Sequence, residues 1–147
     1  MPNELYPVFD IPTISPEIIA NTEVYKPTPY FDFERGDFVR DGTNRVVMVD
    51  GREAYREWVL KTLNTPYGAC AAYPLIGLNS EGATAETNHK AVQATYERAI
   101  TECLLKHPMT QRVRDFTFVL KGSELEIMFT VQGKNLPSLP VRFFARV

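Results

Sequence analysis

Four acidic residues lie within ten positions near the N-terminal end of the chain, and their oxygen atoms could bind a metal ion or take part in acid–base catalysis. In the stretch PYFDFERGDFVRDG they are Asp32, Glu34, Asp37 and Asp41. A calcium-binding EF-hand loop needs glycine at its sixth position and glutamate at its twelfth. Counted from Asp32, these positions hold Asp37 and Thr43, which excludes this type of metal loop.

The same acids could act as a general acid and base only if burial raised the pKa of one of them. In an extended segment, Asp32 and Glu34 would point to one side, opposite Phe31 and Phe33, as in a half-buried strand. We therefore predict that the acids form the solvent side of an extended first strand. The residues expected to anchor it are Phe31, Phe33 and Phe38.

The other residues with catalytic or metal-binding chemistry form no recognisable motif. Nucleophile, phosphate-binding and dinucleotide-binding patterns are absent, and neither His89 nor His107 has a partner at a metal-ligand spacing. Cys70 and Cys103 lie far apart and are expected to be free thiols of a reducing compartment. The sequence thus predicts no catalytic residue, no metal and no cofactor.

The composition is that of one ordinary globular domain. The chain has 147 residues, of which 44% are hydrophobic and 23% are charged, and this length can bury a core without disulfides or metals. With 16 basic and 18 acidic residues there is no bias toward nucleic acid or an acidic membrane surface. No run approaches the roughly 20 apolar residues of a membrane-spanning helix. Nucleic-acid and membrane partners are therefore not expected.

The N-terminal 29 residues differ from the rest because they hold six of the 11 prolines. Each proline removes a backbone donor and fixes φ, so residues 1–29 should form an extended arm. The arm is also rich in apolar side chains, more than a solvated linker carries, and should lie against its own domain or a neighbouring subunit. The residues expected to make this contact are Tyr6, Phe9, Ile11 and Ile14.

A hairpin and a helix are predicted to follow the arm. Asp41-Gly42 separates Phe38-Val39 from the β-branched run at 45–49, which is typical of a hairpin turn. Asp50 should cap a helix with an apolar face, and this helix should end near Asn64 because Pro66 disfavours helix at the residue before it.

The remaining sequence predicts a loop, a second helix and three strands. Residues 65–83 are rich in Gly, Ala and Pro and indicate a loop with buried hydrophobic contacts. A helix should begin near Thr84 and end at about Lys106. Strict alternation at 116–120 and 124–132 predicts a second hairpin, and residues 141–147 predict a terminal strand.

This order predicts an α+β fold, with two helices packed on a small, mostly antiparallel sheet and an extended N-terminal arm. In the terminal strand, Arg142 and Arg146 should share one face, with Phe143 and Ala145 on the other. An exposed sheet edge carries unpaired N–H and C=O groups that can accept a strand from another chain.

The middle of the chain resembles the XkdS-like proteins of phage-type contractile tails. The resemblance covers about residues 30–132 and rests on an ordered series: FDF, GDF, a strand–DG–helix junction, LxTxxG at 63–68 and YPxxG at 73–77. That group is similar to the baseplate wedge proteins called sheath initiators, which have counterparts in type VI secretion baseplates. Residues 30–147 would then be a sheath-initiator-like domain.

The resemblance implies a structural protein without a chemical reaction, present in multiple copies in the tail baseplate of the virion and assembled in the host cytoplasm. It would template the first sheath ring by strand pairing, with the tail sheath protein and the baseplate wedge and hub or tube proteins as partners. The residues expected to contact the sheath are Val141, Arg142, Phe143, Phe144, Ala145, Arg146 and Val147, with Glu124, Glu126 and Met128 as weaker candidates.

Two other functions stay open on the sequence. One is a cell-wall-degrading, lysozyme-like enzyme of the same particle, whose activity would disappear on Asp or Glu to Ala changes. The other is a different tail component, such as a connector or terminator, built on the same small α+β domain.

Overall fold

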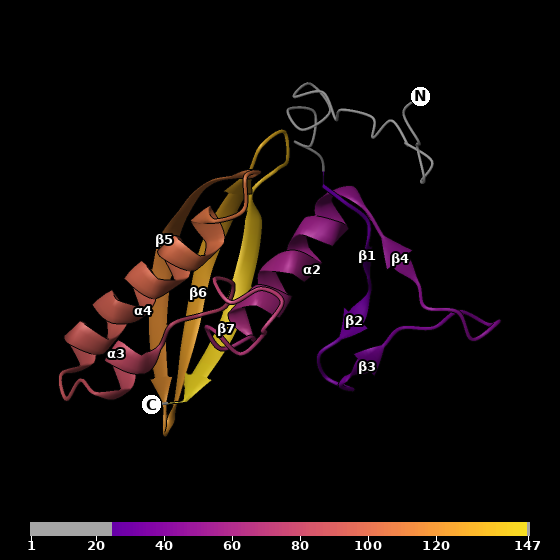
Figure 1. Ribbon diagram of the computed structural model, residues 1–147. Coiled ribbons are helices and arrows are strands. Elements are labelled where there is room, and N and C mark those ends of the chain that lie inside the picture. The colour runs from indigo at the N-terminus through magenta and orange to yellow at the C-terminus, as the bar shows by residue number, and fades with distance from the viewer. Residues whose placement is uncertain (1–24, 147) are drawn as a thin grey trace, which may run out of the picture.

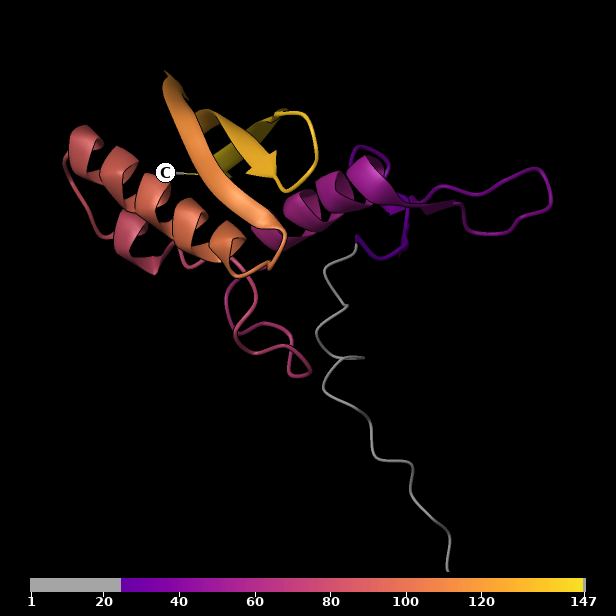
Figure 2. The same cartoon turned by 90° about the horizontal axis from the view of Figure 1, so that it is seen from above.

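The computed structural model describes residues 25–146 and confirms the α+β class. The elements in this range are β1 (Thr28–Pro29), β2 (Phe31–Asp32), β3 (Asp37–Phe38), β4 (Met48–Val49), α2 (Gly51–Leu63), α3 (Glu81–Thr84), α4 (His89–Leu105), β5 (Thr110–Lys121), β6 (Glu124–Gly133) and β7 (Leu139–Arg146) (Figure 1). The main sheet is antiparallel, with strand order β5-β6-β7. Figure 2 shows α2 and α4 on one face of this sheet.

The core lies between that face and the two helices. The predicted alternation in β6 is confirmed, since every second side chain is 3% exposed or less and packs toward the helices: Leu125, Ile127, Phe129 and Val131. Burial of such side chains stabilises the fold by about 1.5–3 kcal/mol each. The helix residues in the same cluster include Tyr55, Val59, Tyr96, Ile100 and Leu104.

The boundaries of α2 agree with the prediction, whereas the start of α4 does not. Asp50 is the N-cap and Asn64 the C-cap of α2. The prediction that the second long helix begins near Thr84 is wrong, because Thr84 ends the short helix α3. The N-cap of α4 is Asn88, whose Oδ1 accepts the backbone N–H of Lys90 at 3.0 Å. Asparagine is as good a cap as threonine or better, and sequence alone did not choose between them.

The predicted hairpin is present as part of a longer ribbon. Residues 28–49, the N-terminal ribbon, contain the pairs β1–β4 and β2–β3; β1 lies alongside α2, and the turn at 40–46 extends away from the sheet and helices (Figures 1 and 2). At its far turn, Asp41 donates its N–H to the carbonyl oxygen of Arg45 at 2.8 Å. A hydrogen bond from the Thr43 hydroxyl is the main cause that lowers the pKa of the Asp41 carboxyl.

The prediction of a continuous extended first strand is wrong. Asp32 Oδ1 accepts the backbone N–H groups of Glu34 and Arg35 at 2.9 and 3.1 Å, so the chain turns back directly after β2. An aspartate that bonds the backbone just beyond it favours such a turn over a strand. The Phe31 ring packs edge-on against Phe33 and Phe38, but these two rings are 39% and 40% exposed.

The segment 65–83 buries two hydrophobic side chains, those of Leu78 and Ala83. Leu78 is 6% exposed and accepts the N–H of Tyr67 while donating its own N–H to Thr65. The larger side chains Tyr73 and Leu75 are 63% and 66% exposed, so only part of this loop makes the predicted buried hydrophobic contacts.

The N-terminal arm falls mostly outside the described residues. Tyr6, Phe9, Ile11 and Ile14 lie there, so their role and the division of the chain into 1–29 and 30–147 stay predictions. At the first described position, the Tyr25 hydroxyl donates to the carbonyl oxygen of Lys134 at 2.6 Å. None of the helices found in 25–146 is both long and apolar enough to cross a membrane.

Candidate protein-interaction surface

The free edge of the main sheet is the long side of β7. This strand pairs with β6 without a break from Glu124 opposite Arg146 to Val131 opposite Leu139. Within residues 25–146, no strand pairs with its other side. The opposite edge strand, β5, contains register shifts between Thr110 and Arg112 and between Arg114 and Thr117, so it is the less regular edge.

The side chains of β7 alternate as the sequence predicts. Val141 and Ala145 are 6% and 7% exposed and belong to the core, and Phe143 packs partly against it. Arg142, Phe144 and Arg146 are exposed on the other face of the sheet. Val147, the last of the predicted sheath-contact residues, lies outside the described range. The predicted set is thus divided between the core and the surface.

Pro140 indicates which backbone groups of β7 face the free edge. Proline has no N–H, so within a strand it fits where its nitrogen points away from the neighbouring strand. In an antiparallel strand this direction alternates from one residue to the next. The N–H groups of Arg142, Phe144 and Arg146 therefore point to the free edge, and those of Val141, Phe143 and Ala145 point to β6.

We call the face of the sheet opposite to the helices the outer face. Cross-strand partners place its side chains in rows from β5 through β6 to β7. The rows are Lys121–Glu124–Arg146, Val119–Glu126–Phe144 and Thr117–Met128–Arg142, followed by Arg114–Thr130–Pro140 and Arg112–Gln132.

Glu126 lies on the central strand of this outer face and is only 3% exposed. Its carboxylate oxygens form ion pairs with Lys121 Nζ at 2.5 Å and with Arg142 Nε at 2.9 Å. The hydrogen bond from Lys121 is the main cause that lowers the pKa of Glu126. Sequence reasoning placed Glu126 on the correct face but did not foresee its burial, because the covering side chains come from two other strands.

A hollow of about 260 Å³ lies beside this ion-pair cluster on the outer face. Its lining includes Asp115, Met128, Pro140 and Arg142. Asp115 has a φ of +60° and sits where the β5 register shifts, so the irregular backbone opens the sheet surface here.

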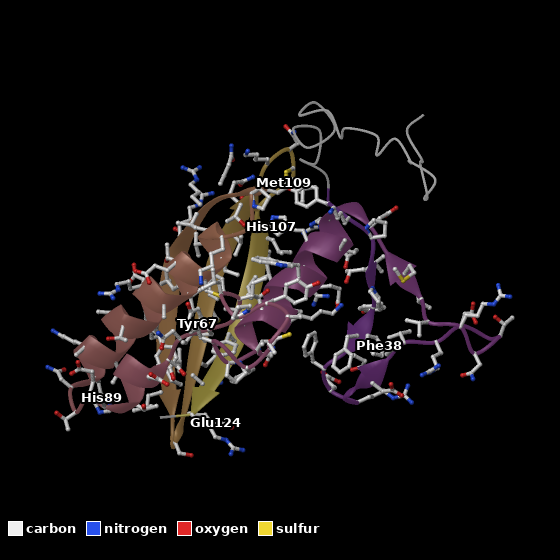
Figure 3. The ribbon with its side chains drawn as sticks, viewed as in Figure 1. Phe38, Tyr67, His89, His107, Met109 and Glu124 are labelled. Carbon is white, nitrogen blue, oxygen red and sulfur yellow. The ribbon has the colours of Figure 1, made fainter. Side chains whose placement is uncertain are left out.

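Histidines, cysteines and acids do not converge on a second site in the part of the chain that the structure describes. No group of three or more such side chains between residues 25 and 146 could hold a metal ion. His89 and His107 lie at opposite ends of α4 (Figure 3). Burial raises the pKa of the Cys103 thiol and lowers that of His107. A larger hollow of about 640 Å³ lies between α4 and the preceding loop, lined by residues such as Tyr67, Glu102 and Lys106.

The comparison with protein families gives a match over most of the chain. The family described as contractile injection system sheath initiator matches residues 28–135. This range begins at β1 and ends just after β6, so β7 lies beyond it. No curated protein matches the chain.

Proposed function

We propose that this chain, which belongs to the contractile injection system sheath initiator family, starts the sheath by pairing the free edge of β7 with a strand from a sheath subunit. Main-chain hydrogen bonds hold a strand added to a sheet, and alternate side chains set its register. Repeated in several copies around the baseplate, this pairing would template the first sheath ring.

Family membership makes the protein a structural component of the baseplate of a phage-type contractile tail. We further propose that its partners are the tail sheath protein and the baseplate wedge and hub or tube proteins, and that it reaches the virion after assembly in the host cytoplasm. The family is a structural one, so neither the wall-degrading enzyme nor the connector is the function that the match supports.

The observation that carries the proposal is that, within 25–146, no strand pairs with the second edge of β7. The position of Pro140 in the strand implies that Arg142, Phe144 and Arg146 direct their N–H groups to this edge. Their side chains lie on the outer face, so an added strand would extend both the ladder and this face. The pairing of β7 with β6 has no bulge to twist the edge away from an incoming strand.

A proline at position 144 tests this directly. Phe144→Pro removes one outward N–H and leaves the ladder to β6 intact, because the N–H groups facing β6 belong to the alternate residues. We expect particles carrying this variant to form baseplates that lack sheath. Phe144→Ala is the matched control, since it removes the same side chain but keeps the N–H, and it should give sheathed particles.

Circular dichroism and unfolding of the isolated variants would establish that both are folded. A second variant combines Phe144→Pro with Arg142→Pro. If both the single and the double variant are folded and still assemble a normal sheath, edge pairing is contradicted. Deletion of residues 141–147 is less informative, because it also removes the core residues Val141 and Ala145.

The N-terminal residues are proposed to bind neighbouring baseplate subunits. Tyr6, Phe9, Ile11 and Ile14 are apolar side chains in a segment that sequence predicts to be extended. Replacing Phe9 and Ile11 by serine should reduce incorporation into baseplates, and circular dichroism of the isolated variant would establish that its domain is folded. Unchanged incorporation would contradict this part of the proposal.

A further inference from the structure

The outer face of the main sheet carries apolar side chains that no other element covers within residues 25–146. Phe144 is 53% exposed and Val119 is 37% exposed, and both are cross-strand neighbours of Glu126. Beside them lies the hollow of about 260 Å³ lined by Met128 and Pro140. Apolar groups grouped at the centre of a polar face mark a docking surface.

The charge on the outer face is opposite in sign to that of the whole chain. The chain has a net charge of −2. On the outer face, basic residues outnumber acidic ones. The basic residues are Arg112, Arg114, Lys121, Arg142 and Arg146, and the acidic residues are Asp115, Glu124 and Glu126. Lys121 and Arg142 share the single carboxylate of Glu126, and Arg114 pairs with Asp115, while Glu124 is the cross-strand partner of Arg146. The excess positive charge therefore lies at Arg112 and at the Glu126 cluster, and neither Arg112 nor Arg146 forms an ion pair within the described residues.

The N-terminal 24 residues have the complementary composition. They contain four acidic residues, Glu4, Asp10, Glu17 and Glu23, and no lysine or arginine. They also contain the aromatic residues Tyr6 and Phe9 together with several aliphatic ones. A segment with acids and aromatics fits a face with arginines around exposed apolar groups.

The first described residue, Tyr25, lies at one end of the main sheet. Tyr25 packs edge-on against Tyr55, with ring centroids 5.3 Å apart, and its hydroxyl bonds the carbonyl oxygen of Lys134, the residue after β6. An extended chain covers about 3.3 Å per residue, so 24 residues can reach roughly 80 Å, several times the length of β7. The short tether also gives an effective concentration of about millimolar for binding within one chain.

We propose that, in the isolated protein, residues 1–24 dock on the outer face of the β5-β6-β7 sheet of their own chain. Acidic side chains of the segment meet Arg112 and Arg146, and an aromatic side chain covers the hollow beside Met128. Docking shields Phe144 until assembly partners displace the segment. This contact concerns the isolated chain and holds whether or not β7 pairs with a sheath strand.

Photo-crosslinking of the full-length protein tests the contact. Benzoylphenylalanine in place of Phe9 should crosslink to residues 110–121 or 139–146 of the same chain, with a yield that does not change on dilution. Arg112→Glu combined with Arg146→Glu should lower this yield by about threefold or more, as expected when two exposed charge pairs are lost. High salt should act in the same direction.

The matched control is Arg52→Glu combined with Arg56→Glu, which makes the same charge change at two exposed positions of α2. It should leave the yield unchanged. Crosslinks only to other surfaces, crosslinks between chains that vanish on dilution, or an equal loss in the control would each overturn the proposal. Because no sheath is present, this outcome is separate from the fate of the Phe144→Pro particles.

Discussion

The backbone N–H of Phe31 donates a hydrogen bond to Oε2 of Glu57 at 3.2 Å, and this carboxylate-bearing side chain is only 1% exposed. One turn later on α2, Lys61 Nζ donates to the carbonyl oxygen of Pro29 at 2.7 Å and to Thr28 Oγ1 at 3.0 Å. A buried polar side chain needs hydrogen-bond partners. Glu57 and Lys61 therefore fix the N-terminal ribbon to the helix.

Removing this carboxylate should loosen the ribbon. Glu57→Ala leaves the Phe31 N–H without its acceptor, at a cost of about 1–3 kcal/mol in unfolding free energy. Hydrogen exchange at residues 28–49 should speed up, and urea unfolding measures the loss of stability. Glu53→Ala, at an exposed position of the same helix, should change stability by less than about 0.5 kcal/mol. Unchanged exchange in the Glu57 variant would contradict this role.

Neighbouring residues of β7 should respond very differently to truncation. Val141→Ala removes core atoms at a side chain that is 6% exposed and should cost about 1–2 kcal/mol. Phe144→Ala removes a larger side chain that is 53% exposed and should cost less than about 0.5 kcal/mol in stability. Equal effects in urea unfolding would mean that the strand register differs from the one described.

Local signals explain which elements could be predicted from the sequence. Asp50 lies at the N-cap position of α2, although its side chain makes no capping hydrogen bond, and the helix ends before Pro66. The alternation of β6 marks its buried face, because prolines and period-two patterns act over a few residues. The same reasoning failed at Thr84, where a better cap lies four residues later, and at Asp32, where a side chain bonds its own backbone and turns the chain.

For the candidate surface, the sequence predicts which side chains share a face of the sheet, but not which charged side chains form ion pairs. Alternation alone divides Arg142 and Arg146 from Phe143 and Ala145, as the structure confirms. The burial of Glu126 could not be predicted, because it depends on Lys121 and Arg142, which reach it from separate strands. Such contacts depend on which strands are neighbours in the sheet, and the sequence of one strand does not determine its neighbours.

The loop between α2 and α3 should depend on glycine at position 77. Its φ is +123°, and an added Cβ would lie 2.7 Å from the backbone oxygens of Thr65 and Pro66. Gly77→Ala should therefore lower the unfolding free energy by about 2 kcal/mol or more through backbone strain and steric conflict. Gly42→Ala is the control, since nothing lies within 4 Å of its added Cβ. Equal unfolding midpoints would contradict the tight closure of this loop.

The Glu126 cluster should make stability sensitive to acid. Lys121, with Arg142, lowers the folded pKa of Glu126 below its ordinary value of 4.5. Its contribution is thus present above about pH 4.5 and is lost as pH falls through the folded pKa. Glu126→Gln should reduce the loss of stability between neutral pH and pH 3, measured by urea unfolding. Glu124→Gln, exposed on the same strand, should keep the wild-type profile.

His107 should add a second pH dependence at milder acidity. The centroid of its ring lies 4.5 Å from that of Trp58 and 6.3 Å from that of Tyr25. Its Nδ1 accepts a hydrogen bond from the backbone N–H of Met109 at 3.0 Å. Burial lowers the folded pKa below 6.5, so the unfolded chain takes up the proton first as pH falls. Stability from the neutral ring is present above about pH 6.5 and is lost as pH falls through the folded pKa.

The two histidines allow this to be measured with a matched pair. His107→Phe keeps an aromatic ring against Trp58 but cannot titrate, so unfolding free energies between pH 8 and 5 should fall less steeply than in the wild type. His89→Asn, at an exposed position at the start of α4, should leave the slope unchanged. Because His107 also contacts Tyr25, its protonation should weaken the packing of the first described residue. A slope that persists in His107→Phe would assign the pH dependence to other groups.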